Sequence, residues 1–264
     1  MSLESYLRNT ANLAVIGDGE KESITRSIAF MQRKLQEHFG ADIVDQKLFG
    51  SYTRGTILPR YMDAQSDIDY MVVFRDGNLR PQTYLDRLRR FVESTYSRSD
   101  IQQSSPTIQL ELNHIRFELV PATRQFWGGL QIPDKSSQNQ GWMATDPNGF
   151  NQTITAANQA NGNLIKPLAR VVKYWNARAG YPFESYALEQ KVAGHGYMLT
   201  PNNLSSYFCE FMSSLDLGWF APEWKTDKIE RARTVVLQAK QYQRSGDEVR
   251  ATSSVKQILP ELVR

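Results

Sequence analysis

The stretch LFGSYTRGTILPRYMDAQSDID, residues 48–69, joins two apolar segments of the chain. Residues 43–49 run into Gly50-Ser51, and residues 68–74 are rich in β-branched and aromatic side chains, so both segments are predicted to be strands. Side chains alternate between the two faces of a strand, so Asp67 and Asp69 point to the same side. The stretch therefore predicts a Gly-Ser turn after one strand and a pair of carboxylates on the next.

The Gly-Ser turn has the features of an anion site. Gly50 has no side chain, so a phosphate group can approach the backbone closely, and Ser51 offers a hydroxyl and an N–H group where a helix is expected to begin. Two adjacent carboxylates repel each other unless a cation lies between them, and their hard oxygen atoms suit magnesium. Each feature alone also has a simpler interpretation, an ordinary turn for the Gly-Ser pair and a strand edge or turn for Asp67 and Asp69.

A third carboxylate occurs in the apolar segment IRFELVPA, residues 115–122. Glu118 lies there between Phe117 and Leu119, where a charge needs a partner or a role. One interpretation pairs it with Arg116 on the same strand face, and Glu111 on the preceding segment is either another candidate or a cross-strand partner. Three carboxylates near a phosphate cradle are the parts of a site in which two metal ions, about 3.5–4 Å apart, support phosphoryl transfer.

The segments around this stretch predict a mixed α/β first half. Apolar residues recur at helical spacing over residues 20–39 and 83–96, and Asn113-His114 separates two alternating segments as a hairpin turn would. Residues 127–151 are dense in Gly, Pro, Asn, Asp and Ser, so we expect a long surface loop there.

The second half of the chain has only helical patterns, for example Ile165, Leu168, Val172 and Trp175 on one face. We therefore predict an α+β protein with two lobes and an active site in the cleft between them. Residues 1–150 form the catalytic lobe, with an N-terminal helix that packs across both lobes, and residues 151–264 form the helical lobe.

Composition narrows the class of protein. The chain of 264 residues has 31 basic and 28 acidic residues, a formal charge of +3 that does not indicate nucleic-acid binding by itself. Cys209 is the single cysteine, which excludes an intrachain disulfide and a cysteine metal cluster. No apolar segment has the length of a signal peptide or a membrane span. We predict a soluble, cytoplasmic monomer that does not associate with membranes.

Three segments in this order, FGSYTRGT, SDIDYMVVF and FELVPA, resemble the DNA polymerase β-like nucleotidyltransferases. The segment NGNLIKPLARVVKYWNARAGYPFESYALEQKV resembles the helical lobe of the cGAS/DncV-like nucleotidyltransferases, the bacterial relatives of oligoadenylate synthetase. The resemblance covers about residues 20 to 220. It implies a polymerase β-like catalytic lobe followed by a helical lobe, consistent with the pattern of the residues.

The resemblance assigns roles to the residues of the first half. It implies that Gly50 and Ser51 hold the donor phosphates. It also implies that Asp67, Asp69 and Glu118 hold magnesium, with manganese as an alternative, and are the catalytic carboxylates. The third position is often aspartate in relatives, and glutamate extends the reach by one methylene group.

In the second half, the resemblance implies that Lys173 contacts the donor triphosphate, with Arg170 as a companion on a similar helix face. Ser185 would contact phosphate and Tyr186 would stack on the donor base. The simpler interpretations are a solvated helix face for Lys173 and Arg170, a helix N-cap for Ser185 and a core position for Tyr186. Relatives place a base-reading residue near Asn158, Asn161 and Asn163, and the sequence does not choose among these three.

The function implied is the condensation of nucleoside triphosphates into a cyclic dinucleotide, or a related cyclic or linear oligonucleotide signal, with release of pyrophosphate. The setting implied is bacterial anti-phage signalling through an effector that responds to the product. The alternatives are nucleotide transfer to an RNA end or to a protein, and a nucleotide-binding module without catalysis. Basic residues are scattered over separate predicted helices, so we expect no obligatory nucleic-acid activator.

Overall fold

The chain is described by a computed structural model that covers residues 1–97, 99–104, 106–138, 140–218 and 220–262. It divides into two compact units. The sheet unit comprises Ile16–Arg60 and Ala64–Asn151, and the helical unit comprises Met1–Val15, Tyr61–Asp63 and Gln152–Arg264. The sequence pattern assigned the first 15 residues to the segment 1–150, whereas in the structure their contacts are with the helical unit.

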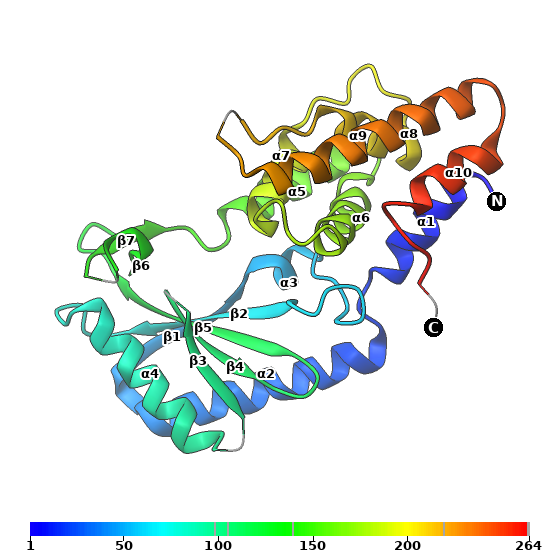
Figure 1. Ribbon diagram of the computed structural model, residues 1–264. Helices are drawn as coiled ribbons and strands as arrows, with labels where there is room; N and C mark the ends of the chain where they lie inside the picture. The colour runs from blue at the N-terminus through cyan, green and yellow to red at the C-terminus, as the bar shows by residue number, and fades with distance from the viewer. Residues whose placement is uncertain (98, 105, 139, 219, 263–264) are drawn as a thin grey trace. The chain divides into compact units, whose positions relative to one another are not determined.

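The strands of the sheet unit form one mixed sheet in the order β1-β2-β5-β4-β3, and β6 and β7 extend it from β5 (Figure 1). β2 and β5 are parallel, and the other paired strands are antiparallel. The strands are β1 (Ile43–Phe49), β2 (Asp67–Phe74), β3 (Asp100–Ser104), β4 (Thr107–Glu111), β5 (Arg116–Arg124), β6 (Leu130–Pro133) and β7 (Trp142–Thr145).

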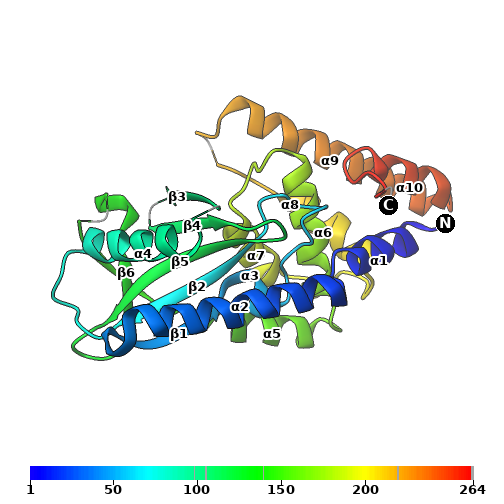
Figure 2. The same cartoon turned by 90° about the horizontal axis from the view of Figure 1, so that it is seen from below.

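Two helices, α2 (Asp18–Phe39) and α4 (Pro81–Thr95), pack on one face of this sheet (Figure 2). Their buried apolar residues form a core with Ile68, Tyr70, Val72 and Phe74 of β2, which are at most 2% exposed. Since side chains alternate along a strand, Asp67 and Asp69 project from the opposite face. The core therefore determines which face of the sheet carries the predicted carboxylates.

Most predicted elements of the sheet unit are confirmed, including both helices, both strands around the Gly-Ser turn and the hairpin between β4 and β5. The predicted long loop over residues 127–151 is wrong. β6 and β7 form a hairpin there, linked by a short 3-10 helix, η2 (Lys135–Ser137). Each strand has only four residues, and β6 pairs with the end of β5. The local sequence therefore has too short a pattern to predict these strands.

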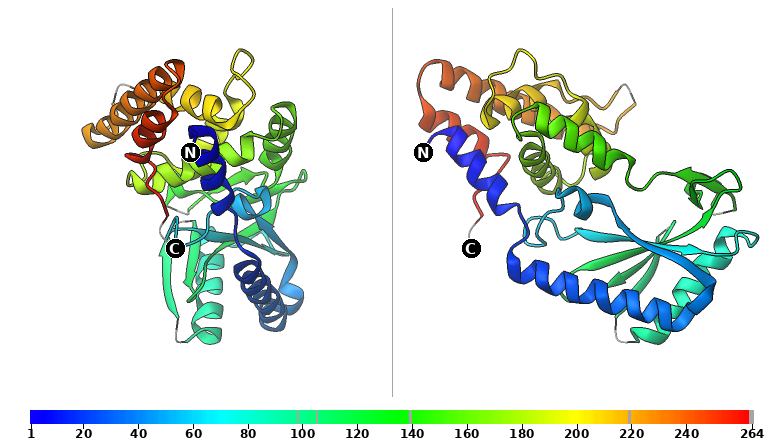
Figure 3. Two further views of the ribbon diagram at one scale, coloured as in Figure 1. Left: turned by 90° about the vertical axis from the view of Figure 1, so that its right-hand side faces the viewer. Right: turned by 180° about the vertical axis from the view of Figure 1, so that it is seen from behind.

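The helical unit contains α1 (Leu3–Leu13), α6 (Ile165–Arg178), α7 (Ser185–Gly194), α8 (Leu204–Ser214), α9 (Glu223–Arg244) and α10 (Glu248–Lys256), and α5 (Gly149–Ala160) leads into it. Figure 3 shows α1, at the blue end of the chain, beside α10 at the red end. The Leu3 amide donates to Glu248 at 2.9 Å, and Glu4 accepts the amides of Leu204 and Ser205 at 3.2 and 2.7 Å. These bonds join the start of the chain to the C-terminal helices.

The mixed sheet with flanking helices, followed by helices alone, confirms the predicted α+β class. Over the described residues, none of the helices combines the length and the apolar character needed to cross a membrane.

Candidate functional site

The Gly-Ser turn lies directly against one of the predicted carboxylates. β1 ends at Phe49 and the short helix α3 (Gly50–Arg54) begins at once, with Gly50 at a φ of +72°. A Cβ atom at Gly50 would lie 1.7 Å from Oδ2 of Asp69, so any side chain at this position would displace the Asp69 carboxylate. The structure thus explains why position 50 is glycine: the absence of a side chain leaves room for the Asp69 carboxylate, which the sequence did not indicate.

The predicted carboxylates share one face of the sheet. In the parallel pairing of β2 with β5, Asp69 stands opposite Glu118 and Asp67 stands opposite Arg116. Paired residues on neighbouring strands project to the same side, so Asp67, Asp69 and Glu118 lie on the face opposite α2 and α4. All three side chains are partly exposed. The sheet therefore places these three residues on one face, and Asp69 is the one that contacts Gly50.

The charged residues around Glu118 are paired with each other. Arg116 Nε donates to Glu111 Oε2 at 2.8 Å, and Glu111 Oε1 also accepts from Arg60. The predicted alternative, an Arg116–Glu118 pair, is not formed in the described residues, and Glu111 is a cross-strand partner. Burial acts to raise the pKa of Glu111, but hydrogen bonds from Arg116 and Arg60 outweigh it and hold that pKa below its usual value.

Glu118 has a partner that the sequence did not reveal. Its Oε1 accepts a hydrogen bond of 2.7 Å from Nε2 of Gln109, which lies opposite it in the β4–β5 register. Side-chain alternation along β4 places Gln109 on the face that carries the carboxylates. The contact with Glu118 could be predicted only from the register between β4 and β5, which the sequence of neither strand gives.

The backbone after Gly50 is fixed by local hydrogen bonds. The Ser51 carbonyl accepts the amides of Thr56 and Ile57 at 3.0 and 3.1 Å, and Thr53 Oγ1 donates to the Gly50 carbonyl at 3.0 Å. Ser51 is partly exposed. These bonds fix the backbone path of the turn that carries Ser51.

The donor set on this face suits a hard divalent cation, because carboxylate oxygens are the ligands that magnesium prefers. The close approach of Asp69 to Gly50 also leaves this carboxylate beside a backbone turn with no intervening side chain. Within the described ranges, no three His, Cys, Asp or Glu side chains are gathered tightly enough to form a metal cluster.

The other predicted site residues lie in the helical unit. Lys173 of α6 is buried, and its Nζ donates to Oε1 of Glu189 on α7 at 3.0 Å, with 6% and 1% of the two side chains exposed. Arg170 Nε donates to the Ala11 carbonyl at 3.3 Å, and burial lowers the pKa of its guanidinium. Neither residue therefore lies on a solvated helix face.

Ser185 and Tyr186 are the first two residues of α7. Glu184 occupies the N-cap position and no side chain caps this helix, so Ser185 does not have the N-cap role considered as an alternative. Tyr186 is 49% exposed and does not belong to the core. An exposed ring at this position has the access that stacking on a base requires.

The three candidate base-reading asparagines take part in hydrogen bonds at the connection between α5 and α6. Asn158 donates to Asn163 Oδ1 at 2.9 Å and accepts the Lys166 amide at 2.9 Å. Asn161 donates to the Ala157 carbonyl and accepts from Tyr207. These bonds stabilise the connection, in which Asn163 has a φ of 62°.

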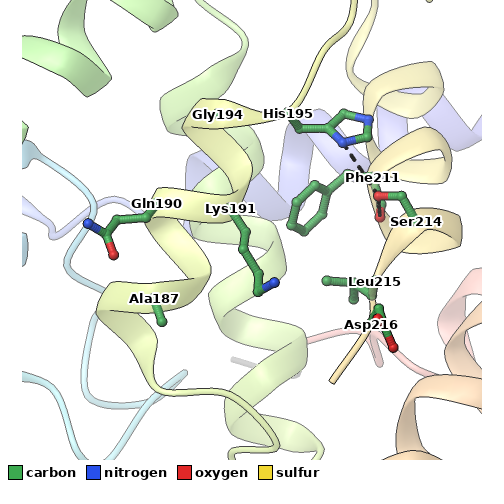
Figure 4. Close-up of a pocket in the computed structure, with 9 residues that line it drawn as sticks. All are labelled: Ala187, Gln190, Lys191, Gly194, His195, Phe211, Ser214, Leu215 and Asp216. Atoms are coloured by element: carbon green, nitrogen blue, oxygen red, sulfur yellow. Dashed lines mark hydrogen bonds between the residues drawn. The ribbon is translucent and has the colours of Figure 1, made fainter. Parts of the chain in front are cut away.

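A separate cavity of about 560 Å³ lies between α7 and α8. Figure 4 shows Lys191 extending from α7 toward Leu215 and Asp216, with the Phe211 ring beside it. His195 Nδ1 lies 3.5 Å from Ser214 Oγ, and burial lowers the pKa of His195. None of Lys173, Ser185 and Tyr186 lines this cavity, so it is distinct from the predicted nucleotide contacts of this unit.

Comparison with known proteins identifies a family and two relatives, each matching somewhat more than half of the chain. Residues 1–158 match the model of the Second Messenger Oligonucleotide or Dinucleotide Synthetase domain. The chain is 28% identical over 154 residues to a probable cyclic nucleotide synthase of Bacillus cereus, covering 52% of this chain and 46% of the relative. It is 26% identical over 147 residues to a cyclic AMP-AMP-AMP synthase of Acinetobacter, covering 54% and 42%. The chain thus spans less than half the length of these two relatives.

Solved structures match almost the whole chain. CdnC of Escherichia coli, determined with ATP, superposes with a TM-score of 0.72 at 12% identity and covers 99% of this chain and 98% of its own. The CD-NTase CdnG of Bradyrhizobium diazoefficiens, determined with GTP, has a TM-score of 0.69 at 12% identity, covering 97% and 98%. At this level of identity the similarity shows the fold, that of the polymerase β-like CD-NTases.

The match to the domain model covers both strands around the Gly-Ser turn, Asp67, Asp69 and Glu118. The fold of the whole chain agrees with it. The chain belongs to the family of Second Messenger Oligonucleotide or Dinucleotide Synthetase domains, the SMODS family.

Proposed function

We propose that the protein is a nucleotidyltransferase that condenses nucleoside triphosphates into a cyclic oligonucleotide, with a cyclic dinucleotide as the leading product. The observation that carries this proposal is the contact of Gly50 with Asp69, in register with Glu118. Three carboxylates beside a turn with no side chain suit a substrate that brings several phosphate charges. Membership in the SMODS family supports the same reaction class.

In the proposed reaction, a ribose hydroxyl of the acceptor attacks the α-phosphorus of the donor nucleotide. The new P–O bond forms as the bond to pyrophosphate breaks, and the hydroxyl proton passes to solvent or to a carboxylate. Magnesium, or manganese in its place, held by Asp67, Asp69 and Glu118 would neutralise phosphate charge and lower the pKa of the attacking hydroxyl. A second transfer closes the ring.

The protein's own groups would orient the donor. Ser51 would contact its phosphates through the hydroxyl and N–H, and Lys173 and Ser185 would supply further contacts from the helical unit. The ammonium of Lys173 donates to Glu189 and is a cation with three N–H groups in all, which suits contact with phosphate. The half-exposed ring of Tyr186 would stack on the base.

The biological setting that we propose is bacterial anti-phage signalling in the cytoplasm, with a monomeric enzyme, an effector that binds the product and no obligatory nucleic-acid activator. The names of the relatives, a probable cyclic nucleotide synthase and a cyclic AMP-AMP-AMP synthase, support the cyclic product that such an effector would bind. One structural neighbour, CdnC, is also known in a complex with a HORMA protein, so a protein regulator is a reasonable partner to test.

Product identification tests the proposal. The purified protein is incubated with all four nucleoside triphosphates and magnesium, alone and with RNA, and the products are resolved by mass spectrometry. We expect a small cyclic oligonucleotide and pyrophosphate. Nucleotide found on RNA or on the protein would indicate the alternative transferases, whereas nucleotide binding without turnover would indicate a module that lacks catalysis.

A further inference from the structure

We infer that Gln109 is a positioning residue for the reaction, acting through Glu118. The inference rests on the proposed function, because it assigns to Glu118 the third carboxylate role. It concerns a residue on β4, the strand next to β5 in the sheet (Figure 1). Gln109 acts by holding one carboxylate oxygen of Glu118 in place.

The contact is direct and set by strand register. Gln109 and Glu118 are paired residues of β4 and β5, and Gln109 Nε2 lies 2.7 Å from Glu118 Oε1. Only the amide can donate in this pair when Glu118 is ionised, so the carboxylate accepts. Among the described residues, the other oxygen, Oε2, has no hydrogen-bond partner, which leaves it available on the face of Asp69.

The hydrogen bond from Gln109 restrains the long side chain of Glu118. Glu118 has one more rotatable bond than an aspartate would, so it can adopt more rotamers beside Asp69. A hydrogen bond to Oε1 selects among these rotamers and thereby fixes the direction of Oε2. Gln109 thus restrains the Glu118 carboxylate, whereas the shorter side chain of an aspartate would be restrained by its own length.

The neutrality of Gln109 matters as well. The adjacent pair on the same two strands, Glu111 and Arg116, is ionic, with Nε and Oε2 at 2.8 Å. A cation at position 109 would neutralise Glu118 and compete with a bound metal ion, whereas an amide orients the carboxylate and leaves its charge in place. The two neighbouring pairs on β4 and β5 therefore have different roles. The ion pair of Glu111 and Arg116 joins the strands, whereas the amide of Gln109 positions Glu118.

A matched control separates positioning from strand stabilisation. Gln131 of β6 donates through Nε2 to Thr123 Oγ1 of β5 at 3.0 Å, so it makes the same kind of cross-strand bond. Thr123 is an odd number of residues from Glu118, so this bond lies on the other face of β5. Gln131→Leu removes a cross-strand bond to a neutral hydroxyl, on the face away from the carboxylates.

The experiment compares Gln109→Leu with Gln131→Leu by steady-state kinetics and thermal unfolding. We expect Gln109→Leu to lower kcat about tenfold, the scale of one hydrogen bond to a charged group, with KM and the melting temperature close to those of Gln131→Leu. We expect Gln109→Lys, which keeps a donor but adds a charge, to lower kcat further. Wild-type kcat in Gln109→Lys would contradict the inference.

A double-mutant cycle with Glu118→Asp completes the test. In the shortened background the bond to residue 109 is lost, so Gln109→Leu should change kcat by less than about twofold. An equal loss in both backgrounds would overturn the inference.

Calorimetric titration with a non-hydrolysable nucleoside triphosphate, with and without magnesium, distinguishes failure of this inference from failure of the proposed function. If the wild type forms no product, the proposed function fails; Gln109 is then kept only as a residue that orients Glu118 for nucleotide binding, provided that Gln109→Leu weakens the magnesium-dependent binding more than Gln131→Leu does. If binding and turnover are the same in Gln109→Leu as in the control, the inference is wrong.

Discussion

Gly50 shows most directly what one residue contributes to the candidate site. The sequence indicated that a glycine there lets phosphate approach, and the structure adds that the Asp69 carboxylate occupies the space of the missing side chain. The position combines two demands, a positive φ and close contact with a functional group. The positive φ disfavours other residues, and the contact with Asp69 leaves no room for a side chain, so this position requires glycine on both grounds.

We predict that Gly50→Ala lowers kcat by at least about 100-fold, because the new methyl group displaces the Asp69 carboxylate. Gly55→Ala is the matched control, since Gly55 has a φ of +70° but a methyl group there would have no neighbouring atom within 4 Å. Both variants should lose about 1 kcal/mol of stability from backbone strain. Equal activity of the two variants in a turnover assay would contradict this account of Gly50.

Cys209 gives a prediction on pH dependence. Burial on α8 raises the pKa of its thiol to about 12. The reactive thiolate is therefore scarce in the folded protein at all pH values well below this, whereas the unfolded chain titrates near its ordinary value of about 8.5. We expect alkylation at pH 8 only in denaturant, measured by intact mass, and rapid labelling of the native protein would show that the thiol is accessible.

At the scale of elements, the sequence predicted what local periodicity determines. The helices α2 and α4 and the strands β1 and β2 have strong patterns of buried residues, and these are confirmed. The β6–β7 hairpin was missed because its short strands depend on pairing with β5. The contact of Gln109 with Glu118 was missed for the same reason, because the sequence of one strand does not determine its register with a neighbouring strand.

The Lys173–Glu189 pair links α6 to α7, and both side chains are almost fully buried. Removal of one partner leaves a buried charge with weakened compensation, so Glu189→Gln should destabilise the protein by about 3–5 kcal/mol. Replacement of both, in Lys173→Met/Glu189→Leu, should recover much of that loss. Urea unfolding of the single and double variants checks this, and additive losses would contradict a coupled pair.

The same double variant also tests the proposed role of Lys173 in nucleotide binding. If Lys173 contacts the donor phosphates, the double variant should have a higher KM for nucleoside triphosphate although its stability recovers. An unchanged KM would restrict Lys173 to a structural role in the helical unit.

At the scale of the whole molecule, the first 15 residues belong with helices more than 150 residues later in the chain. Leu3 and Leu7 of α1 are fully buried, and Glu4 accepts the amides that begin α8. An amphipathic pattern in α1 predicts that it packs on something, but it cannot identify the partner. The hydrophobic periodicity of the sequence therefore cannot predict to which unit α1 belongs.

Glu4→Ala tests this long-range contact. It removes an acceptor from the N-terminus of α8, so we expect a loss of about 1 kcal/mol in the free energy of unfolding, typical of a helix cap. Glu22→Ala on α2 is the control, because that side chain is 71% exposed. Equal stability of the two variants in chemical denaturation would indicate that the contact contributes little.

In the proposed function, Asp67, Asp69 and Glu118 act with the Gly-Ser turn in phosphodiester formation. The most direct measurement is quantitative mass spectrometry of the oligonucleotide made from mixed nucleoside triphosphates by the wild type, by Asp67→Asn/Asp69→Asn and by the exposed control Asp100→Asn. We expect a cyclic product from the wild type and from the control. The yield from the double variant should be at least about 1,000-fold lower, since paired carboxylates are replaced by neutral amides. A double variant that folds and still forms the product at the wild-type rate would contradict the claim.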